Sequence, residues 1–497
     1  MSRNTVIAGQ AGVSFAGFLF GQATRFAFNL LVARLLGLDA LGIYAIAVAV
    51  IQIAEVLALL GLDSGLLRFI NLHNGDPERQ KGVIGSALKS ALFFSFAIVL
   101  LVLLFSGPIA AAFNGGRLLQ LTLCCYAASI PFSAATVLFG HAIQGFKKLE
   151  PKIIATQVVS PLLLLLFTTL FRYTAGRDEA LLLPYLLSAA AVFFWIRPRL
   201  AAFTGIGTDD LLHAPLDRAM LSYALPFMAV SLLSMTAHWL DVMMLGIFTD
   251  TATVGLYHPA ARTAGMIRSV LLAFSGIAAP MIAELHASRR NDEIGRIFKM
   301  VTRWIVVATI PPALLFMLLP EPVLGLFGAR FSAGTSALVL LTGAAFLQAT
   351  LGLSSTVLAM TGFGRLSLFN ALGALACQIA LNLFLIPKMG INGAALATLL
   401  VFLLLSTARL LEIGHFLHIH PFARSLWKPL LSALASAGLL LFARPWLLQL
   451  TPAAGVAAGA LLLLFSHLSV MLFLKLEDEE REIIIKYVPF LGKELKR

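Results

Sequence analysis

Residues 91–105 read ALFFSFAIVLLVLLF and contain no charged side chain. They lie inside a longer apolar stretch, and a helix needs about 20 such residues to cross a bilayer. Similar stretches recur along the chain, whereas the short alternating segments of a membrane β-barrel do not appear. The pattern predicts an all-α polytopic membrane protein with about 14 transmembrane helices. We expect these helices near 12–35, 41–62, 84–106, 118–140, 153–171, 181–201, 220–247, 253–282, 300–319, 334–360, 366–386, 391–411, 428–448 and 453–474.

The composition excludes an ordinary soluble enzyme. Of the 497 residues, 59% are hydrophobic and 12% are charged, and the mean hydropathy is +0.92. A soluble domain is roughly 25% charged. Cys124, Cys125 and Cys377 fall in apolar runs without metal-ligand spacing, so we expect small buried side chains, no disulfide framework, and neither cofactor nor metal. The first apolar stretch is too long for a cleavable signal peptide and carries Arg25, so it predicts a retained first helix.

The net charge of +12 is arranged as membrane topology rather than as a nucleic-acid surface. Lys and Arg concentrate in alternate connections between the apolar stretches. One side holds 26 of them, including those of both termini, and the other side holds 7. Basic connections face the cytoplasm. The count predicts that both termini are cytoplasmic, with no nucleic acid among the partners.

The chain repeats itself weakly, as many transporters do. The turn Gly42-Ile-Tyr44 recurs as Gly255-Leu-Tyr257, and other matches follow in the same order at similar offsets. This predicts two pseudo-symmetric six-helix lobes with two additional C-terminal helices. The expected parts are an N-terminal lobe at 1–205, a C-terminal lobe at 206–415, helices 13 and 14 at 416–475, and a cytoplasmic tail at 476–497.

Three stretches carry a family resemblance. They are Arg34-Leu-Leu-Gly-Leu-Asp-Ala-Leu-Gly-Ile-Tyr44, Asp241-Val-Met-Met-Leu-Gly246, and Asn382-Leu-Phe-Leu-Ile-Pro-Lys-Met-Gly-Ile-Asn-Gly-Ala-Ala-Leu-Ala-Thr398. Together with the helix count, they resemble the polysaccharide transporter and oligosaccharide flippase family, which includes O-antigen flippases. That family is a branch of the multidrug/oligosaccharidyl-lipid/polysaccharide exporter (MOP) superfamily.

The resemblance implies an alternating-access flippase of the bacterial inner membrane. Its substrate would be an undecaprenyl-pyrophosphate-linked oligosaccharide, moved from the cytoplasmic to the outer leaflet for cell-surface polysaccharides such as lipopolysaccharide O-antigen or exopolysaccharide. The implied partners are this lipid-linked oligosaccharide, membrane lipids, and a polysaccharide polymerase with its chain-length regulator. Relatives in the superfamily move peptidoglycan lipid precursors, or export drugs in exchange for cations, and both alternatives stay open.

Polar side chains at membrane depth are costly and mark candidate functional sites. Helical spacing places Gln22, Arg25 and Asn29 on one face of the first helix. A shift of 209 residues brings Arg25 onto Ser234 and Asn29 onto His238, in the seventh helix. We expect these two polar stripes to face a shared substrate cavity. His238 could be linked to proton movement or could be a hydrogen-bonded packing residue.

Charged residues complete the predicted cavity. Arg25, Arg262 and Arg268 would form its cationic centre, because a guanidinium binds a pyrophosphate through bidentate hydrogen bonds and keeps its charge when buried. Glu55 and Asp241 could take part in ion coupling. They could instead be structural, with Glu55 neutralising Arg25 and Asp241 pairing with Arg262.

Three function classes differ in what such a cavity should contain. A cation-coupled drug exporter would favour acidic groups, whereas three arginines face two deep carboxylates here. A membrane polymerase or ligase usually needs a large external catalytic loop, and the predicted connections are short, so we expect no enzyme. No Gly-x-x-x-x-Gly-Lys-Ser/Thr motif appears, so the driving force would be an ion gradient, the membrane potential or downstream use of the product.

Overall fold

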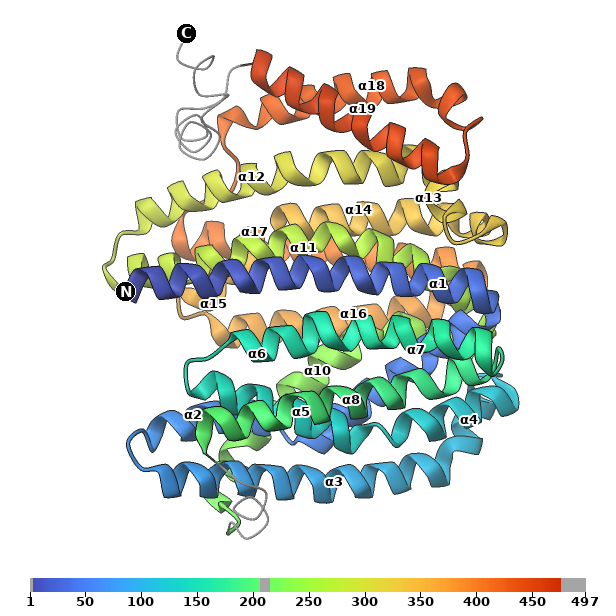
Figure 1. Ribbon diagram of the computed structural model, residues 1–497. Helices are drawn as coiled ribbons and strands as arrows, with labels where there is room; N and C mark the ends of the chain where they lie inside the picture. Colours follow the sequence, from blue (N-terminus) through green and yellow to red (C-terminus); the bar gives the residue numbers. More distant parts are fainter. Residues whose placement is uncertain (1–2, 206–214, 475–497) are drawn as a thin grey trace. The chain divides into compact units, whose positions relative to one another are not determined.

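The computed structural model describes residues 3–205 and 215–474, with side chains from residue 16 onward. Throughout this part the chain forms helices and connecting turns, without a strand (Figure 1). The predicted all-α class is therefore confirmed. The expected C-terminal tail lies outside the described residues.

Within residues 3–205 and 215–474, thirteen helical segments are long and apolar enough to cross a membrane. They are Ala16–Leu72, Pro77–Ala112, Gly116–Gly145, Glu150–Thr174, Glu179–Thr204, Arg218–Phe248, Thr251–Ala287, Asn291–Leu318, Ala329–Met360, Gly364–Met389, Ile391–Leu417, Arg424–Leu447 and Pro452–Phe473. The first is long enough to cross twice, and its first helix, α1 (Arg3–Leu59), is broken at Gly37. The described chain thus agrees with the expected number of about 14 transmembrane helices.

The break in α1 has a physical cause. Gly37 has φ of +81° and ψ of −174°, a conformation open to glycine and strained for other residues. The first half of α1 ends there, which leaves its last carbonyl groups without helical donors. Arg177 donates through Nε to the carbonyl oxygen of Leu36 at 2.9 Å, and Arg172 donates to that of Leu35 at 3.3 Å. Cations are also favoured at this negative end of a helix.

Two units, formed by separate sets of residues, are each compact. Unit 1 comprises Met1–Thr263 with Leu375–Ala397, and unit 2 comprises Ala264–Ala374 with Thr398–Arg497. The predicted six-helix lobes of 1–205 and 206–415 follow the repeat rather than this division, and they stay a prediction.

Unit 1 contains α1, a set of six shorter helices, and the two helices that follow them. It also contains parts of α11 (Thr251–Ala287), α16 (Gly364–Met389) and α17 (Ile391–Leu417). The six are α2 (Leu62–Leu72), α3 (Pro77–Ala112), α4 (Gly116–Ala127), α5 (Ile130–Gly145), α6 (Glu150–Ile153) and α7 (Ser160–Thr174). A π-helical turn, η1 (Ile154–Val159), joins α6 to α7, and α8 (Glu179–Thr204) and α10 (Arg218–Phe248) follow. Its core buries apolar side chains from α2, α3, α5, α8 and α10.

The beginning of α11 (Thr251–Ala287) packs against α1 at a pair of glycines. A Cβ added at Gly42 would meet the main chain of Thr251 and Gly255, and one added at Gly255 would meet the main chain of Leu38 and Gly42. Small residues allow membrane helices to approach this closely. Gly42 and Gly255 are equivalent positions of the predicted repeat, so two related turns lie against each other.

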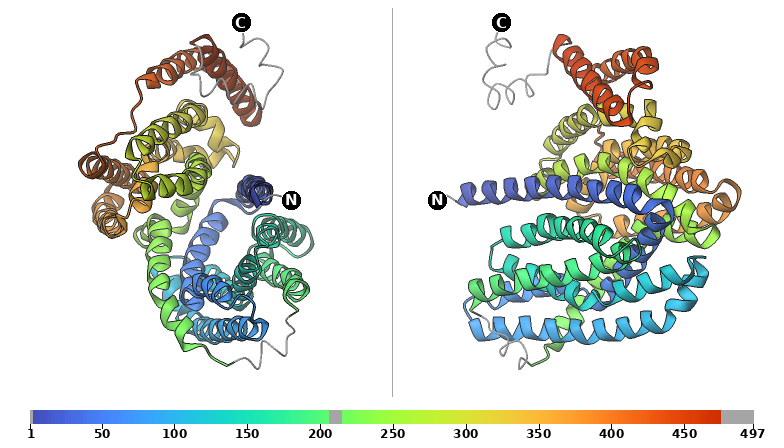
Figure 2. Two further views of the ribbon diagram at one scale, coloured as in Figure 1. Left: turned by 90° about the vertical axis from the view of Figure 1, so that its left-hand side faces the viewer. Right: turned by 45° about the vertical axis from the view of Figure 1, so that its right-hand side comes forward.

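Unit 2 contains the remaining helices. They are the rest of α11, α12 (Asn291–Leu318), α13 (Pro320–Gly325), the 3₁₀ turn η2 (Ala329–Gly334), α14 (Thr335–Leu351), α15 (Leu353–Met360), part of α16 (Gly364–Met389), most of α17 (Ile391–Leu417), the 3₁₀ turn η3 (Arg424–Leu426), α18 (Trp427–Leu447) and α19 (Pro452–Phe473). The last two lie side by side as a hairpin that also contacts α12 (Figure 2). They correspond closely to the expected helices 13 and 14.

Candidate functional site

Arg25 is held between α1 and the π-helical turn η1. Its Nη1 donates to Oε1 of Gln157 at 2.9 Å and to Oε1 of Gln22 at 3.4 Å. Its Nη2 donates to the carbonyl oxygen of Thr156 at 3.2 Å. In the described part of the chain no ion pair joins Arg25 to Glu55, and these three acceptors are neutral. No direct contact therefore supports the alternative in which Glu55 neutralises Arg25.

A buried hydrogen bond links α1 to α11 one turn further along. Asn29 is 6% exposed, and its Nδ2 donates to the carbonyl oxygen of Arg25 at 2.8 Å. Its Oδ1 lies 3.0 Å from Nε2 of His258, which is 1% exposed. Because Asn29 presents its acceptor here, His258 donates from Nε2. No sequence pattern predicts that His258 belongs to the site.

Trp239 extends this contact to a second arginine. Its ring is parallel to that of His258, with an interplanar angle of 3° and centroids 6.2 Å apart. The guanidinium carbon of Arg262 lies 4.7 Å from the Trp239 ring centroid, a cation–π contact. The Trp239 Nε1 donates to Oε1 of Gln52 at 3.0 Å.

These contacts form one connected set, which we call the polar strip. It comprises Gln22, Arg25, Asn29, Gln52, Thr156, Gln157, Trp239, His258 and Arg262. Its members come from α1, η1, α10 and α11, and all belong to unit 1. The strip joins two guanidinium groups within helices that are apolar enough to cross a membrane.

Asp241 is held in a different cluster of unit 1. Its Oδ1 accepts from Nε2 of Gln378 and from Nδ2 of Asn382, both at 2.8 Å. Its Oδ2 accepts from the hydroxyl of Tyr257 at 3.0 Å. Three hydrogen bonds stabilise a carboxylate that would otherwise be costly at this depth. The expectation of Asp241 as a coupling or pairing residue stays untested, while the amide partners from α16 are new.

Glu55 lies on α1, three residues after Gln52. Its Oε1 is buried and has no hydrogen-bond partner among the described residues. A buried oxygen left without a partner is costly. Its assignment to ion coupling stays a prediction.

The other predicted residues have contacts of their own. Ser234 is exposed and its hydroxyl donates to the carbonyl oxygen of Val230 in its own helix at 2.9 Å. His238 is exposed, with its ring edge-on to Trp239 at 5.1 Å between centroids. Arg268 belongs to unit 2, where its Nη1 donates to Oε1 of Gln348 at 3.4 Å. The structure brings Gln22, Arg25, Asn29 and Arg262 together and shows Arg268 in the second unit.

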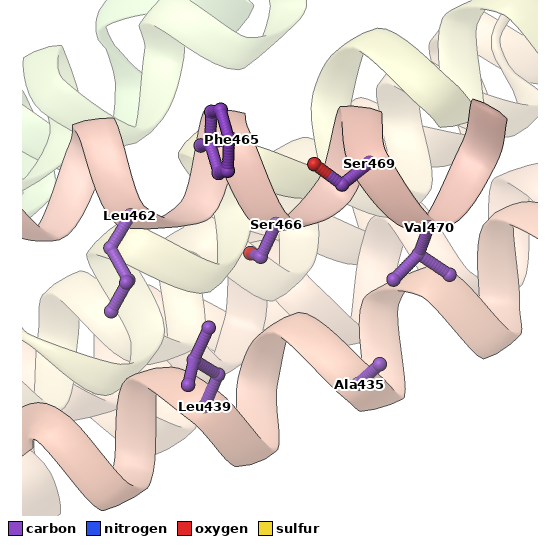
Figure 3. Close-up of a pocket in the computed structure, with 7 residues that line it drawn as sticks. All are labelled: Ala435, Leu439, Leu462, Phe465, Ser466, Ser469 and Val470. Atoms are coloured by element: carbon purple, nitrogen blue, oxygen red, sulfur yellow. The ribbon is translucent and has the colours of Figure 1, made fainter. Parts of the chain in front are cut away.

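Unit 2 also has an apolar pocket between α18 and α19, with a volume of about 320 Å³ (Figure 3). It is lined by Ala435, Leu439, Leu462, Phe465, Ser466, Ser469 and Val470. The Ser466 hydroxyl donates to Oγ of Ser436 at 3.0 Å, so this hydroxyl is already used within the hairpin. Unlike the polar strip, the pocket has no charged group in its lining.

Comparison with known proteins identifies the family. A model for the polysaccharide biosynthesis protein family matches residues 9–286, more than half of the chain. A probable flippase of low-salt glycan biosynthesis from Haloferax volcanii is 23% identical over 395 residues, which is 78% of this chain and 79% of the relative. A second probable flippase of that organism, AglR, is 28% identical over 231 residues, which is 40% of this chain and 48% of the relative.

Solved structures agree in fold. The lipid II flippase MurJ, in an inward closed conformation, has a TM-score of 0.74 at 15% identity, covering 92% of this chain and 97% of that one. An inward-facing multidrug resistance MATE family transporter of the MOP superfamily has a TM-score of 0.72 at 17% identity, covering 84% and 99%. The chain thus has the fold of these transporters, and it belongs to the polysaccharide biosynthesis protein family.

Proposed function

We propose that this protein is a flippase for a lipid-linked oligosaccharide. The substrate we infer is an undecaprenyl-pyrophosphate-linked unit, moved by alternating access from the cytoplasmic to the outer leaflet for cell-surface polysaccharide synthesis. Family membership and the glycan flippases among the relatives support the class. The process breaks no covalent bond, so the role we assign is transport rather than catalysis.

The polar strip is the observation on which the proposal rests. A sugar and a pyrophosphate cannot cross hydrocarbon at reasonable cost without polar partners. Arg25 and Arg262 offer planar forks that suit phosphate oxygens, and the neutral acceptors around Arg25 leave its positive charge available to an anion. Gln22 and Ser234 are further candidates for contact with the sugar or headgroup, and Arg268 is a candidate from unit 2.

The proposal includes a place and an orientation. We assign the protein to a bacterial inner membrane with both termini in the cytoplasm, on the distribution of Lys and Arg. The two lobes of the predicted repeat would move against each other. Contact between Gly42 and Gly255, which the repeat makes equivalent, supports a pseudo-two-fold axis near that point. A polysaccharide polymerase and a chain-length regulator would receive the product outside.

Reconstitution distinguishes this proposal from export of drugs or of peptidoglycan precursors. Proteoliposomes containing the purified chain would be loaded with an undecaprenyl-pyrophosphate-linked oligosaccharide, with lipid II, or with a cationic dye. We expect accessibility of the oligosaccharide to an external glycan-modifying enzyme to rise with protein content. Movement of lipid II or of the dye alone would contradict the proposed substrate class.

A further inference from the structure

Helix α1 approaches the end of α6 and the π-helical turn η1 through two glycines. A Cβ added at Gly17 would lie 2.5 Å from Cγ2 of Ile153. One added at Gly21 would lie 2.6 Å from Oε1 and 2.9 Å from the carbonyl oxygen of Gln157. A larger residue at Gly17 would displace the Ile153 side chain, and one at Gly21 would meet the main chain of Gln157. The Gly-x-x-x-Gly spacing of α1 thus brings Gln157 within reach of Arg25.

Pro161 explains why η1 is a π-helical turn. Proline has no N–H, and its ring clashes with the carbonyl group four residues earlier, so the α-helical pattern breaks before it. The N–H of Ser160 donates to the carbonyl oxygen of Ala155 instead of to that of Thr156. The next N–H that a π-turn would direct to Thr156 belongs to residue 161, which is proline. The Thr156 carbonyl is therefore left for Arg25, whose Nη2 donates to it at 3.2 Å.

The acceptors that η1 offers are both neutral, namely an amide oxygen and a main-chain carbonyl oxygen. They fix the direction of the guanidinium without cancelling its charge. A carboxylate in the place of the Gln157 amide would form a charge-assisted pair with Arg25, and charge-assisted pairs are roughly twice as strong as neutral hydrogen bonds. A phosphate oxygen can displace the amide, but it would have to compete with a carboxylate.

We propose that Gln157 is a positioning residue, which holds Arg25 ready for an anionic headgroup and releases it when the headgroup binds. The inference rests on the proposed function, because Arg25 is its substrate-contacting group. It deepens that function, because it attributes the orientation of the Arg25 guanidinium to a turn that Pro161 creates. Gln157 is half-buried and lies about two helical turns inside its span.

The test compares Gln157→Glu with Gln157→Leu and a matched control, in the full-length chain purified in detergent. Gln144→Glu is the control, because it makes the same change of charge in unit 1 beside Lys152, whose Nζ donates to Gln144 at 2.7 Å. The probe is farnesyl pyrophosphate, with farnesol as the probe that lacks the charge. Binding affinity and thermal midpoint are measured for each variant.

We expect Gln157→Glu to weaken farnesyl pyrophosphate binding by at least about tenfold while farnesol binding and the thermal midpoint stay near those of the unchanged chain. Gln157→Leu should weaken farnesyl pyrophosphate binding by about threefold, because Arg25 then loses only the hydrogen bond that orients its guanidinium. Gln144→Glu should have little effect. In an Arg25→Ala background, Gln157→Glu should add no further loss, a coupling that a merely structural residue would not show.

Farnesyl pyrophosphate binding that is unchanged in Gln157→Glu would overturn the inference, as would equal losses for both probes. The proposed function has its own outcome in the same experiment. If Arg25→Ala binds farnesyl pyrophosphate as well as the unchanged chain does, the assignment of Arg25 to the substrate is wrong. If Arg25→Ala loses binding and Gln157→Glu keeps it, only the role of Gln157 is wrong.

Discussion

At the scale of single residues, two polar neighbours on one face of α1, Arg25 and Asn29, have opposite surroundings. Arg25 is half-buried, with neutral acceptors around its guanidinium, whereas Asn29 is buried and satisfied on both sides. The first arrangement leaves a charge able to meet an anion. The second is a fixed connection between α1 and α11. A polar stripe in a sequence therefore need not have one function along its length.

Replacing Asn29 by Ala should lower stability rather than remove transport outright. The change leaves His258, which is 1% exposed, without its partner, and an unsatisfied buried group costs about 1–3 kcal/mol. We expect a lower thermal midpoint in detergent and reduced abundance in the membrane. Ser222→Ala is a suitable control, because its exposed hydroxyl donates only within its own helix. A midpoint for Asn29→Ala equal to that of this control would show that the Asn29–His258 bond has no structural weight.

At the scale of helices, tight approach through glycine holds α1 against α11. A Cβ at Gly42 would collide with the main chain of Thr251, which cannot move aside as a flexible side chain can. We therefore expect Gly42→Ala to reduce the amount of folded protein severalfold, measured by fluorescence-detected size exclusion. Overpacking of this kind typically costs about 1–3 kcal/mol.

Gly373→Ala is the matched control for that experiment. Gly373 also lies within a membrane-spanning helix, but a Cβ added there meets no atom within 4 Å. The amount of folded Gly373→Ala protein should therefore stay normal. Equal amounts of the two variants would mean that the close approach of α1 and α11 is not needed for folding.

The elements themselves were largely predictable, and the partners of the site were only partly so. Long apolar runs decide where helices cross, and the expected 391–411 and 428–448 lie close to α17 and α18. The break at Gly37 was expected as the turn between two helices. Gln157 was missed, because nothing local links it to Arg25, 132 residues away in the chain. The signal available in the sequence was Pro161, a proline within an apolar run, which predicts a break in the helix just before it.

Pairing of charges was the other point where sequence reasoning reached its limit. The depth of Arg25 and Glu55 within apolar stretches predicts that both belong to the cavity, and it leaves open whether they pair. In the structure Arg25 uses Gln157 and Gln22, while Asp241 uses Tyr257, Gln378 and Asn382. Which amide meets which charge depends on tertiary contacts between helices far apart in sequence, and no periodicity encodes those contacts.

At the scale of the whole molecule, the orientation in the membrane can be tested by labelling. Cysteines placed at 116 and 250 should react from outside intact cells, and those at 150 and 290 only after permeabilisation. All four positions are exposed at ends of helices, and Nδ2 of Asn114 donates to the carbonyl oxygen of Thr249 at 3.0 Å, so the first two connections share one side.

The labelling needs a background without Cys124, Cys125 and Cys377, and one of its variants needs an abundance control. Asp250 caps α11 by accepting from the N–H of Thr253 at 2.7 Å. Hydrogen bonds from the hydroxyl of Thr253 and from this N–H lower the pKa of the Asp250 carboxyl group. Losing such a cap costs about 1 kcal/mol. External reaction at 150 would reverse the proposed orientation.

The central claim is that Arg25 acts on the anionic headgroup of the substrate. Its most direct measurement is glycan export together with protein level in cells that carry Arg25→Ala, Arg25→Lys or the Arg25→Ala/Glu55→Ala double variant. We expect Arg25→Ala to abolish export at near-normal abundance, because Arg25 pairs with no buried carboxylate in the described chain. Arg25→Lys should keep partial export, since it retains the charge without the bidentate fork. If the single alanine variant is unstable and the double variant regains both abundance and export, Arg25 only neutralises Glu55, and the site assignment is wrong.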